Sequence, residues 1–119
     1  MRIMVVEAYK LLRTSLVGML RDNGYDVVAE ANRGAEAVEK IKEHKPELVL
    51  LDIHGDTFEA TREIKKIYPE VKVVMLSLAE DVDDEPAAIE SGADGYIGKN
   101  ATTAELFEAI NTALERPAA

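Results

Sequence analysis

The sequence predicts an α/β protein in which helices cover both faces of one parallel sheet. Short apolar runs alternate along the chain with longer segments whose apolar residues recur every three or four positions. Runs of the first kind are typical of buried strands, and segments of the second kind are typical of amphipathic helices. Several boundaries fall at residues that interrupt regular structure, such as Gly24, Pro46 and Gly92. Alternation of this kind predicts βαβ units, in which neighbouring strands run parallel.

The expected strands differ in their apolar character. Residues 3–6 form a continuous apolar run, as expected for a strand buried on both faces. Residues 47–52 contain the most apolar run in the chain and should form a central strand, whereas residues 26–29 should be less buried. Residues 71–77 and the brief run 95–97 complete the sheet.

A helix is expected after each strand. The predicted spans are residues 10–23, 34–43, 56–66, a short helix that runs through 89, and 103–115. The positions expected to face the sheet are Leu12, Leu16, Met19, Leu20, Ala35, Val38, Ile41, Phe58, Ile64, Leu106, Ile110 and Leu114. Thr102 or Thr103 can cap the last helix, because a hydroxyl oxygen accepts from the free amides of a first turn.

Length and composition predict one folded domain. The chain has 119 residues, and 47% of them are hydrophobic, which is too apolar for a disordered segment. We expect the domain to span residues 1–116, with 117–119 forming a tail or the start of a linker. No apolar run approaches the roughly 20 residues of a membrane-spanning helix. The first residues do not resemble a signal peptide, so we expect a cytoplasmic protein.

Charge and residue content exclude several classes of function. Cysteine is absent, which removes thiol catalysis and cysteine-based zinc sites, and two histidines are too few for most histidine-based metal sites. There are 14 Lys and Arg residues against 23 Asp and Glu residues, a net charge of −9. This acidic balance argues against nucleic-acid binding by this domain, because neutralising phosphates requires clustered basic residues.

Polar side chains gather where the expected strands end. Glu7 follows the first strand, and Asp52 ends the third. Ser77 ends the fourth strand, and Lys99 lies just beyond the fifth. Because parallel α/β sheets bind ligands at the carboxyl ends of their strands, we expect these groups to converge on one site.

Two stretches at this edge identify a family. Residues 46–52 and 91–99 resemble the receiver domains of two-component response regulators, the CheY-like superfamily. The resemblance runs from Arg2 to about Leu114, and residues 91–99 look most like receivers that precede a helix-turn-helix DNA-binding domain. It implies a doubly wound, flavodoxin-like (βα)5 domain with strand order 2-1-3-4-5.

The resemblance also implies roles for single residues. Asp52 matches the aspartate that accepts a phosphoryl group from a sensor histidine kinase, and Lys99 matches the lysine that pairs with that group. Ser77 matches the hydroxyl that moves toward a phosphoryl oxygen, and Tyr96 matches the aromatic residue that turns inward with it. Such domains are not enzymes beyond magnesium-assisted self-phosphorylation and autodephosphorylation.

The sequence departs from the family at the expected magnesium site. Ala8 stands where the family carries a second acidic residue that ligates Mg²⁺ directly. The remaining candidate ligands are Asp52, the backbone carbonyl of His54 and Glu7, so we expect Mg²⁺ binding to be weak or absent. Asp56 is either a substitute ligand or, by preference, a helix N-cap.

Two further departures affect loops near the site. The usual Met-Pro-Gly turn after the phosphoryl acceptor is missing, and residues 53–57 form a loop about three residues shorter than usual. Pro86 falls where the fourth helix normally runs, so that helix should start late and be short. The acidic cluster at residues 80–85 is expected to form a solvated loop that would attract a basic surface.

Two functional hypotheses remain open at this stage. The first is a phosphoryl-accepting receiver that switches a protein-interaction surface. The alternative is a pseudo-receiver that acts as a binding or dimerisation module without phosphorylation. A homodimer and a fused or separate output domain are compatible with either.

Enzymes of related architecture fit less well. A haloacid-type phosphatase needs a second aspartate where His54 stands, and residues 7–10 are not a flavodoxin phosphate loop. The chain also contains no Gly-Lys-Ser/Thr phosphate-binding loop.

Overall fold

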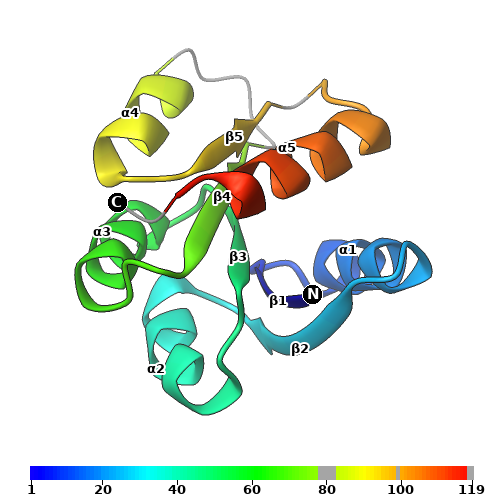
Figure 1. The fold of residues 1–119 in the computed structure, drawn as a ribbon, viewed down its shortest axis with the longest axis horizontal. Helices are drawn as coiled ribbons and strands as arrows, with labels where there is room; N and C mark the ends of the chain where they lie inside the picture. Colours follow the sequence, from blue (N-terminus) through cyan, green and yellow to red (C-terminus); the bar gives the residue numbers. More distant parts are fainter. Residues whose placement is uncertain (78–82, 99, 118–119) are drawn as a thin grey trace.

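A parallel five-stranded sheet forms the centre of the molecule (Figure 1). The computed structural model describes residues 1–77, 83–98 and 100–117. The strands are β1 (Arg2–Val6), β2 (Asp26–Ala31), β3 (Leu48–Asp52), β4 (Lys72–Leu76) and β5 (Gly95–Ile97). Their order is β2-β1-β3-β4-β5, and every neighbouring pair is parallel, which confirms the expected topology.

Five helices alternate with these strands in the described part of the chain. They are α1 (Lys10–Asp22), α2 (Gly34–His44), α3 (Thr57–Ile67), α4 (Asp84–Ser91) and α5 (Thr103–Glu115). Helices α1 and α5 pack on one face of the sheet, and α2, α3 and α4 pack on the other (Figure 1). None of the described helices is long and apolar enough to cross a membrane.

The two sides of the sheet bury separate apolar layers. Successive side chains of a strand point to opposite faces, so each central strand contributes to both layers. In β4, for example, Val74 joins the layer under α1 and α5, and Met75 joins the layer under α2 and α3. Residues of β3 from Leu48 to Leu51 are fully buried, as expected for the central strand.

The helix ends follow from their local sequence. Thr102 caps α5: its hydroxyl oxygen accepts from the amide of Glu105 at 3.1 Å, and the Glu105 carboxylate accepts from the Thr102 amide at 3.2 Å. Gly92 ends α4 with a φ of 99°, a conformation that favours glycine because it has no Cβ. Of the two threonines predicted as possible caps of α5, the structure uses Thr102 and not Thr103.

The prediction of which α2 residues face the sheet is wrong at one position. Ala35 is exposed, and Gly34, Ala37 and Ile41 form the buried stripe. The reason lies outside the helix. The first residue of α2 is pressed against α3, because a Cβ on Gly34 would lie 2.5 Å from the Cβ of Ala60.

Helix α4 is short, as expected, and spans eight residues with Pro86 in its first turn. The expectation of a solvated acidic loop is wrong for Asp84 and Glu85, which form the first turn of α4. Residues 80–82 of that acidic cluster lie outside the described residues. Acidic residues suit a first turn, because the free amides there carry partial positive charge.

Candidate functional site

Three of the four expected polar groups lie at the carboxyl edge of adjacent strands. Glu7 follows β1, Asp52 ends β3, and Ser77 follows β4. All three are buried, with exposed fractions of 1%, 6% and 1% respectively. The fourth group, Lys99, lies outside the described residues.

Glu7 and Asp52 form a buried pair of carboxylates. Within the described structure, Oε2 of Glu7 and Oδ1 of Asp52 are buried without a hydrogen-bond partner. The second oxygen of Glu7, Oε1, accepts from the Tyr9 amide at 3.1 Å. Burial raises the pKa of Asp52 from 3.8 to about 7, and the Glu7 carboxylate adds to the increase as a partner for the proton and as a like charge. The Asp52 carboxyl therefore changes charge near neutral pH.

A cavity of about 350 Å³ opens beside this pair. Its lining includes Glu7, Ala8, Arg33, Asp52, His54 and Asp56. Ala8 and His54 are exposed at the rim, and the rings of His54 and Tyr9 lie 5.9 Å apart. Asp52 is therefore buried but lines a cavity at the carboxyl edge of the sheet.

The donor set of this cavity fits a hard divalent cation. Mg²⁺ is commonly held by one or two carboxylates and keeps several waters. The partnerless oxygens of Glu7 and Asp52 would be two such ligands. Among the residues that the structure describes, no group of three His, Asp or Glu side chains could hold a metal ion.

Asp56 caps a helix, but not the helix that the sequence indicated. Its Oδ1 accepts from the Gly34 amide at 2.7 Å, and its Oδ2 accepts from the Ala35 amide at 2.9 Å. Asp56 therefore caps α2, although it immediately precedes α3, and its side chain makes no capping bond to α3. The N-cap interpretation named the right kind of contact but the wrong helix.

The expected switch residues lie directly after β4, at Ser77, and on β5, at Tyr96. The Ser77 hydroxyl donates to Oδ2 of Asp84 at 2.8 Å, and the Ser77 amide donates to the Ile97 carbonyl at 2.8 Å. Tyr96 is half-buried and packs against the apolar layer under α2, α3 and α4. Asp84 was missed by sequence reasoning, because it was one acid in a run assigned to a loop.

Arg13 is a second residue that sequence reasoning missed. Its guanidinium donates to the Glu7 carbonyl at 2.8 Å and to Oδ1 of Asn32 at 2.7 Å, and it forms an ion pair with Glu30 at 3.3 Å. These contacts hold the turn after β1 against the turn after β2. No local pattern in α1 indicates them.

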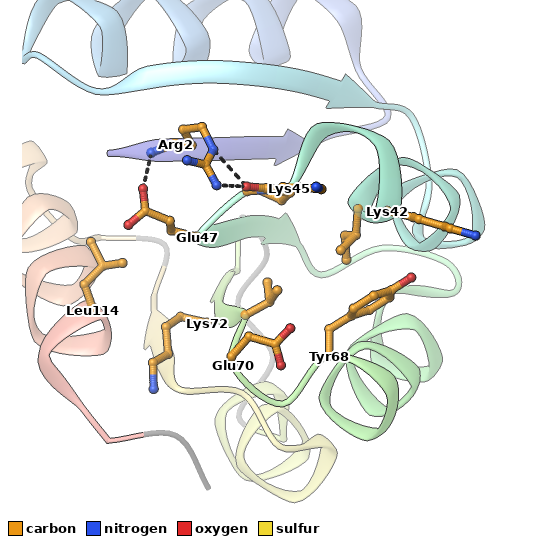
Figure 2. Close-up of a pocket in the computed structure, with 11 residues that line it drawn as sticks. Arg2, Lys42, Lys45, Glu47, Tyr68, Glu70, Lys72 and Leu114 are labelled. Carbon is orange, nitrogen blue, oxygen red and sulfur yellow. Dashed lines mark hydrogen bonds between the residues drawn. The ribbon is translucent and has the colours of Figure 1, made fainter.

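A larger cavity, of about 540 Å³, lies at the opposite edge of the sheet (Figure 2). Arg2, which begins β1, and Lys72, which begins β4, line it together with Glu47 and Glu70. The Arg2 guanidinium donates a hydrogen bond to the Lys45 carbonyl at 2.9 Å, and the Arg2 backbone amide donates to the Glu47 carboxylate at 3.1 Å. This cavity is separate from the Asp52 site, because it lies where the strands begin.

Comparisons with known proteins agree with this geometry. The chain is 39% identical over 116 residues to the chemotaxis protein CheY of Bacillus subtilis, covering 95% of this chain and 97% of CheY. It is 36% identical over 113 residues to the response regulator GacA of Pseudomonas viridiflava, covering 92% of this chain and 53% of GacA. The chain thus spans about half the length of GacA.

A solved structure also matches this chain in both fold and sequence. A two-component response regulator of the LuxR family from Aurantimonas sp. SI85-9A1 matches with a TM-score of 0.85 and 32% identity, covering 95% of this chain and 84% of that one. The family model described as the response regulator receiver domain matches residues 3–111. The chain therefore belongs to the response regulator receiver domains of two-component systems.

Proposed function

We propose that this domain accepts a phosphoryl group on Asp52 from a sensor histidine kinase and changes a protein-interaction surface in response. The observation that carries the proposal is the buried Asp52 carboxylate, which has a partnerless oxygen beside an open cavity at the carboxyl edge of the sheet. An acceptor carboxylate that lines an open cavity is what an incoming phosphoryl donor requires.

The transfer needs little covalent machinery. An oxygen of ionised Asp52 bonds to phosphorus as the P–N bond of a phosphohistidine breaks, and the leaving imidazole takes a proton from solvent. Positioning and charge neutralisation supply most of the rate in such transfers. Lys99 is proposed to neutralise the phosphoryl oxygens, since an ammonium is a compact point charge.

Glu7 and Asp52 would hold Mg²⁺, with the His54 carbonyl as a further candidate ligand. When bound, the ion supplies positive charge that offsets the two carboxylates and the phosphoryl oxygens. Because burial and Glu7 raise the pKa of Asp52 to about 7, any added positive charge in the cavity favours the ionised form that attacks phosphorus.

Ser77 and Tyr96 are the proposed switch. A phosphoryl group on Asp52 adds charged acceptor oxygens near the Ser77 hydroxyl, which favours one packing of β4 and β5 over another. The affected surface would include α4, which begins seven residues after Ser77. Since related chains include GacA and a LuxR-family regulator, the output proposed here is control of transcription through a fused or separate domain.

The pseudo-receiver alternative is not favoured. A binding module that never carries a phosphoryl group has no need to bury two carboxylates with partnerless oxygens, because each costs free energy. The chain has the buried Glu7 and Asp52 carboxylates although Ala8 replaces the second acidic residue of the family, and this supports a phosphoryl-accepting role for Asp52.

Intact-mass spectrometry after incubation with acetyl phosphate tests the proposal. In this reaction the phosphorus bonds to Asp52 as the P–O bond to acetate breaks and acetate leaves. We expect wild type to gain one phosphoryl mass when Mg²⁺ is present, and Asp52→Asn to gain none. Asp22→Asn, which removes an exposed carboxylate from the end of α1, should label like wild type.

Two outcomes would count against the proposal. Labelling that persists in Asp52→Asn would place the acceptor elsewhere. Absence of labelling in wild type, both from acetyl phosphate and from a phosphorylated histidine kinase domain, would favour the pseudo-receiver.

A further inference from the structure

One contact at the site is explained by neither the fold nor the proposed transfer. The hydroxyl of Ser77, a residue that is 1% exposed, donates to Oδ2 of Asp84 at 2.8 Å. Asp84 is the first residue of α4 and is half-buried. The bond therefore ties the end of β4 to the first turn of α4.

This bond uses the only proton that the hydroxyl has. A serine hydroxyl donates one hydrogen bond, so it cannot serve two anions fully at once. Hydrogen bonds from a hydroxyl to an ionised carboxylate are about twice as strong as neutral ones. A phosphoryl group on Asp52 would therefore have to compete with Asp84 for this proton.

The negative charge of Asp84 also acts on the phosphoryl acceptor, Asp52. Its negative charge is one of the causes that raise the pKa of Asp52, after burial and Glu7. The carboxylates of Asp84 and Asp52 are thus close enough to interact electrostatically. An anion that arrives at Asp52 meets both the occupied hydroxyl and this like charge.

We propose that Asp84 is a positioning residue that holds the Ser77 hydroxyl in the unmodified domain and releases it when an anion binds at Asp52. The inference rests on the proposed function, and it assigns to Asp84 control over how strongly the phosphoryl group is retained. Release of the bond also frees the first turn of α4. In this way occupancy of Asp52 is transmitted to a helix on which Ile89 is 67% exposed.

Affinity for beryllium trifluoride, an anion that mimics a phosphoryl group on aspartate, measures this competition. We expect Asp84→Ala to bind it roughly 10-fold more tightly than wild type in a calorimetric titration with Mg²⁺, as expected for loss of one charged hydrogen bond. Asp84→Asn should give a smaller gain, because a neutral amide oxygen still accepts from Ser77.

Glu85→Ala is the matched control. It removes the adjacent acid of the same helix turn. Glu85 is exposed, and in the described structure the Ser77 hydroxyl donates to Asp84 rather than to Glu85. We expect it to change the affinity by less than about 2-fold, the size of a screened surface charge effect. An equal gain for Glu85→Ala and Asp84→Ala would overturn the proposal.

A double-mutant cycle separates the hydrogen bond from simple charge repulsion. If Asp84 acts through the hydroxyl, Asp84→Ala should lose most of its effect in a Ser77→Ala background. If the full gain persists without the hydroxyl, repulsion alone explains it and the positioning role is wrong. Circular dichroism of each variant checks that it folds.

The same variants distinguish failure of this inference from failure of the proposed function. If Asp84→Ala binds beryllium trifluoride and wild type does not, Asp84 blocks the site and the inference holds. If neither binds, the phosphoryl site and the competition are both contradicted. In that case, energetic coupling between Ser77→Ala and Asp84→Ala in urea unfolding would show only that the contact forms.

Discussion

The carboxylate of Asp56 caps the helix that begins at Gly34, 22 positions earlier in the chain. One oxygen accepts from the Gly34 amide at 2.7 Å, and the other accepts from the next amide of α2 at 2.9 Å. An ionised acid at this place satisfies two free amides and faces the positive end of the helix. The contact fixes the loop after Asp52, which lines the cavity beside Asp52, to the first turn of α2.

We expect Asp56→Ala to lower the free energy of unfolding by about 1–2 kcal/mol, because two amides of α2 lose their acceptor. Asp56→Asn should cost less, since its amide oxygen still accepts one bond. Urea unfolding at pH 7 measures both. Glu63→Ala, which removes an exposed acid within α3, is the control, and a cost equal to that of Asp56→Ala would contradict the capping role.

A second expectation compares two glycines in helices. Gly34→Ala should destabilise the protein by about 1–3 kcal/mol, because the new methyl group would meet Ala60 and Asp56 at 2.5 and 2.8 Å. Gly18→Ala in α1 meets nothing within 4 Å and should stabilise by about 0.5–1 kcal/mol through helix propensity. Thermal unfolding of both variants checks this, and the same sign of change for both would refute it.

The raised pKa of Asp52 predicts a pH-dependent gain in stability for Asp52→Asn. Between about pH 4 and 7 the folded protein retains a proton that the unfolded chain has released, so wild type loses stability as the pH rises through this window. The asparagine variant lacks this loss. Without metal, its advantage over wild type should be small at pH 4.5 and reach about 1–3 kcal/mol at pH 8.

Denaturant midpoints in EDTA at several pH values measure that advantage. Asp22→Asn, which changes an exposed carboxylate, should have a free energy of unfolding that differs from that of wild type by the same small amount at every pH. An Asp52→Asn advantage that is constant with pH would mean that the carboxyl is already ionised at pH 4.5.

The missing acid at position 8 gives a prediction for metal binding. Ala8→Asp adds a third carboxylate to Glu7 and Asp52, so it should tighten Mg²⁺ binding by at least about 10-fold. Without Mg²⁺ the same variant should be less stable than wild type, because a third like charge faces the buried pair. The shift of the melting temperature during a Mg²⁺ titration at constant ionic strength reports the affinity.

Ala8→Asn is the control for this titration, because it is similar in size but carries no charge. If both variants shift the Mg²⁺ response equally, the added charge is not what matters at this position. Asp52→Asn in the Ala8→Asp background should remove most of the gain.

Much of the fold follows from the sequence, for a local reason. Each of the five strands was found near its predicted position, because apolar runs between glycine and proline boundaries record burial directly. The position of Glu7, Asp52 and Ser77 at one sheet edge was equally predictable. A residue that ends a parallel strand must lie at that edge whatever its neighbours are.

The contacts that tune the site were decided only by the tertiary structure. Asp56 precedes α3 but caps α2, and Asp84 stands in an acidic run but engages Ser77. Ala35 was expected inward, but α2 turns Gly34 toward α3 instead. Residue type and periodicity determine which face of an element is apolar, whereas the partner of a polar atom depends on how two elements approach each other. That approach is set by packing between residues far apart in the chain, so no local pattern records it.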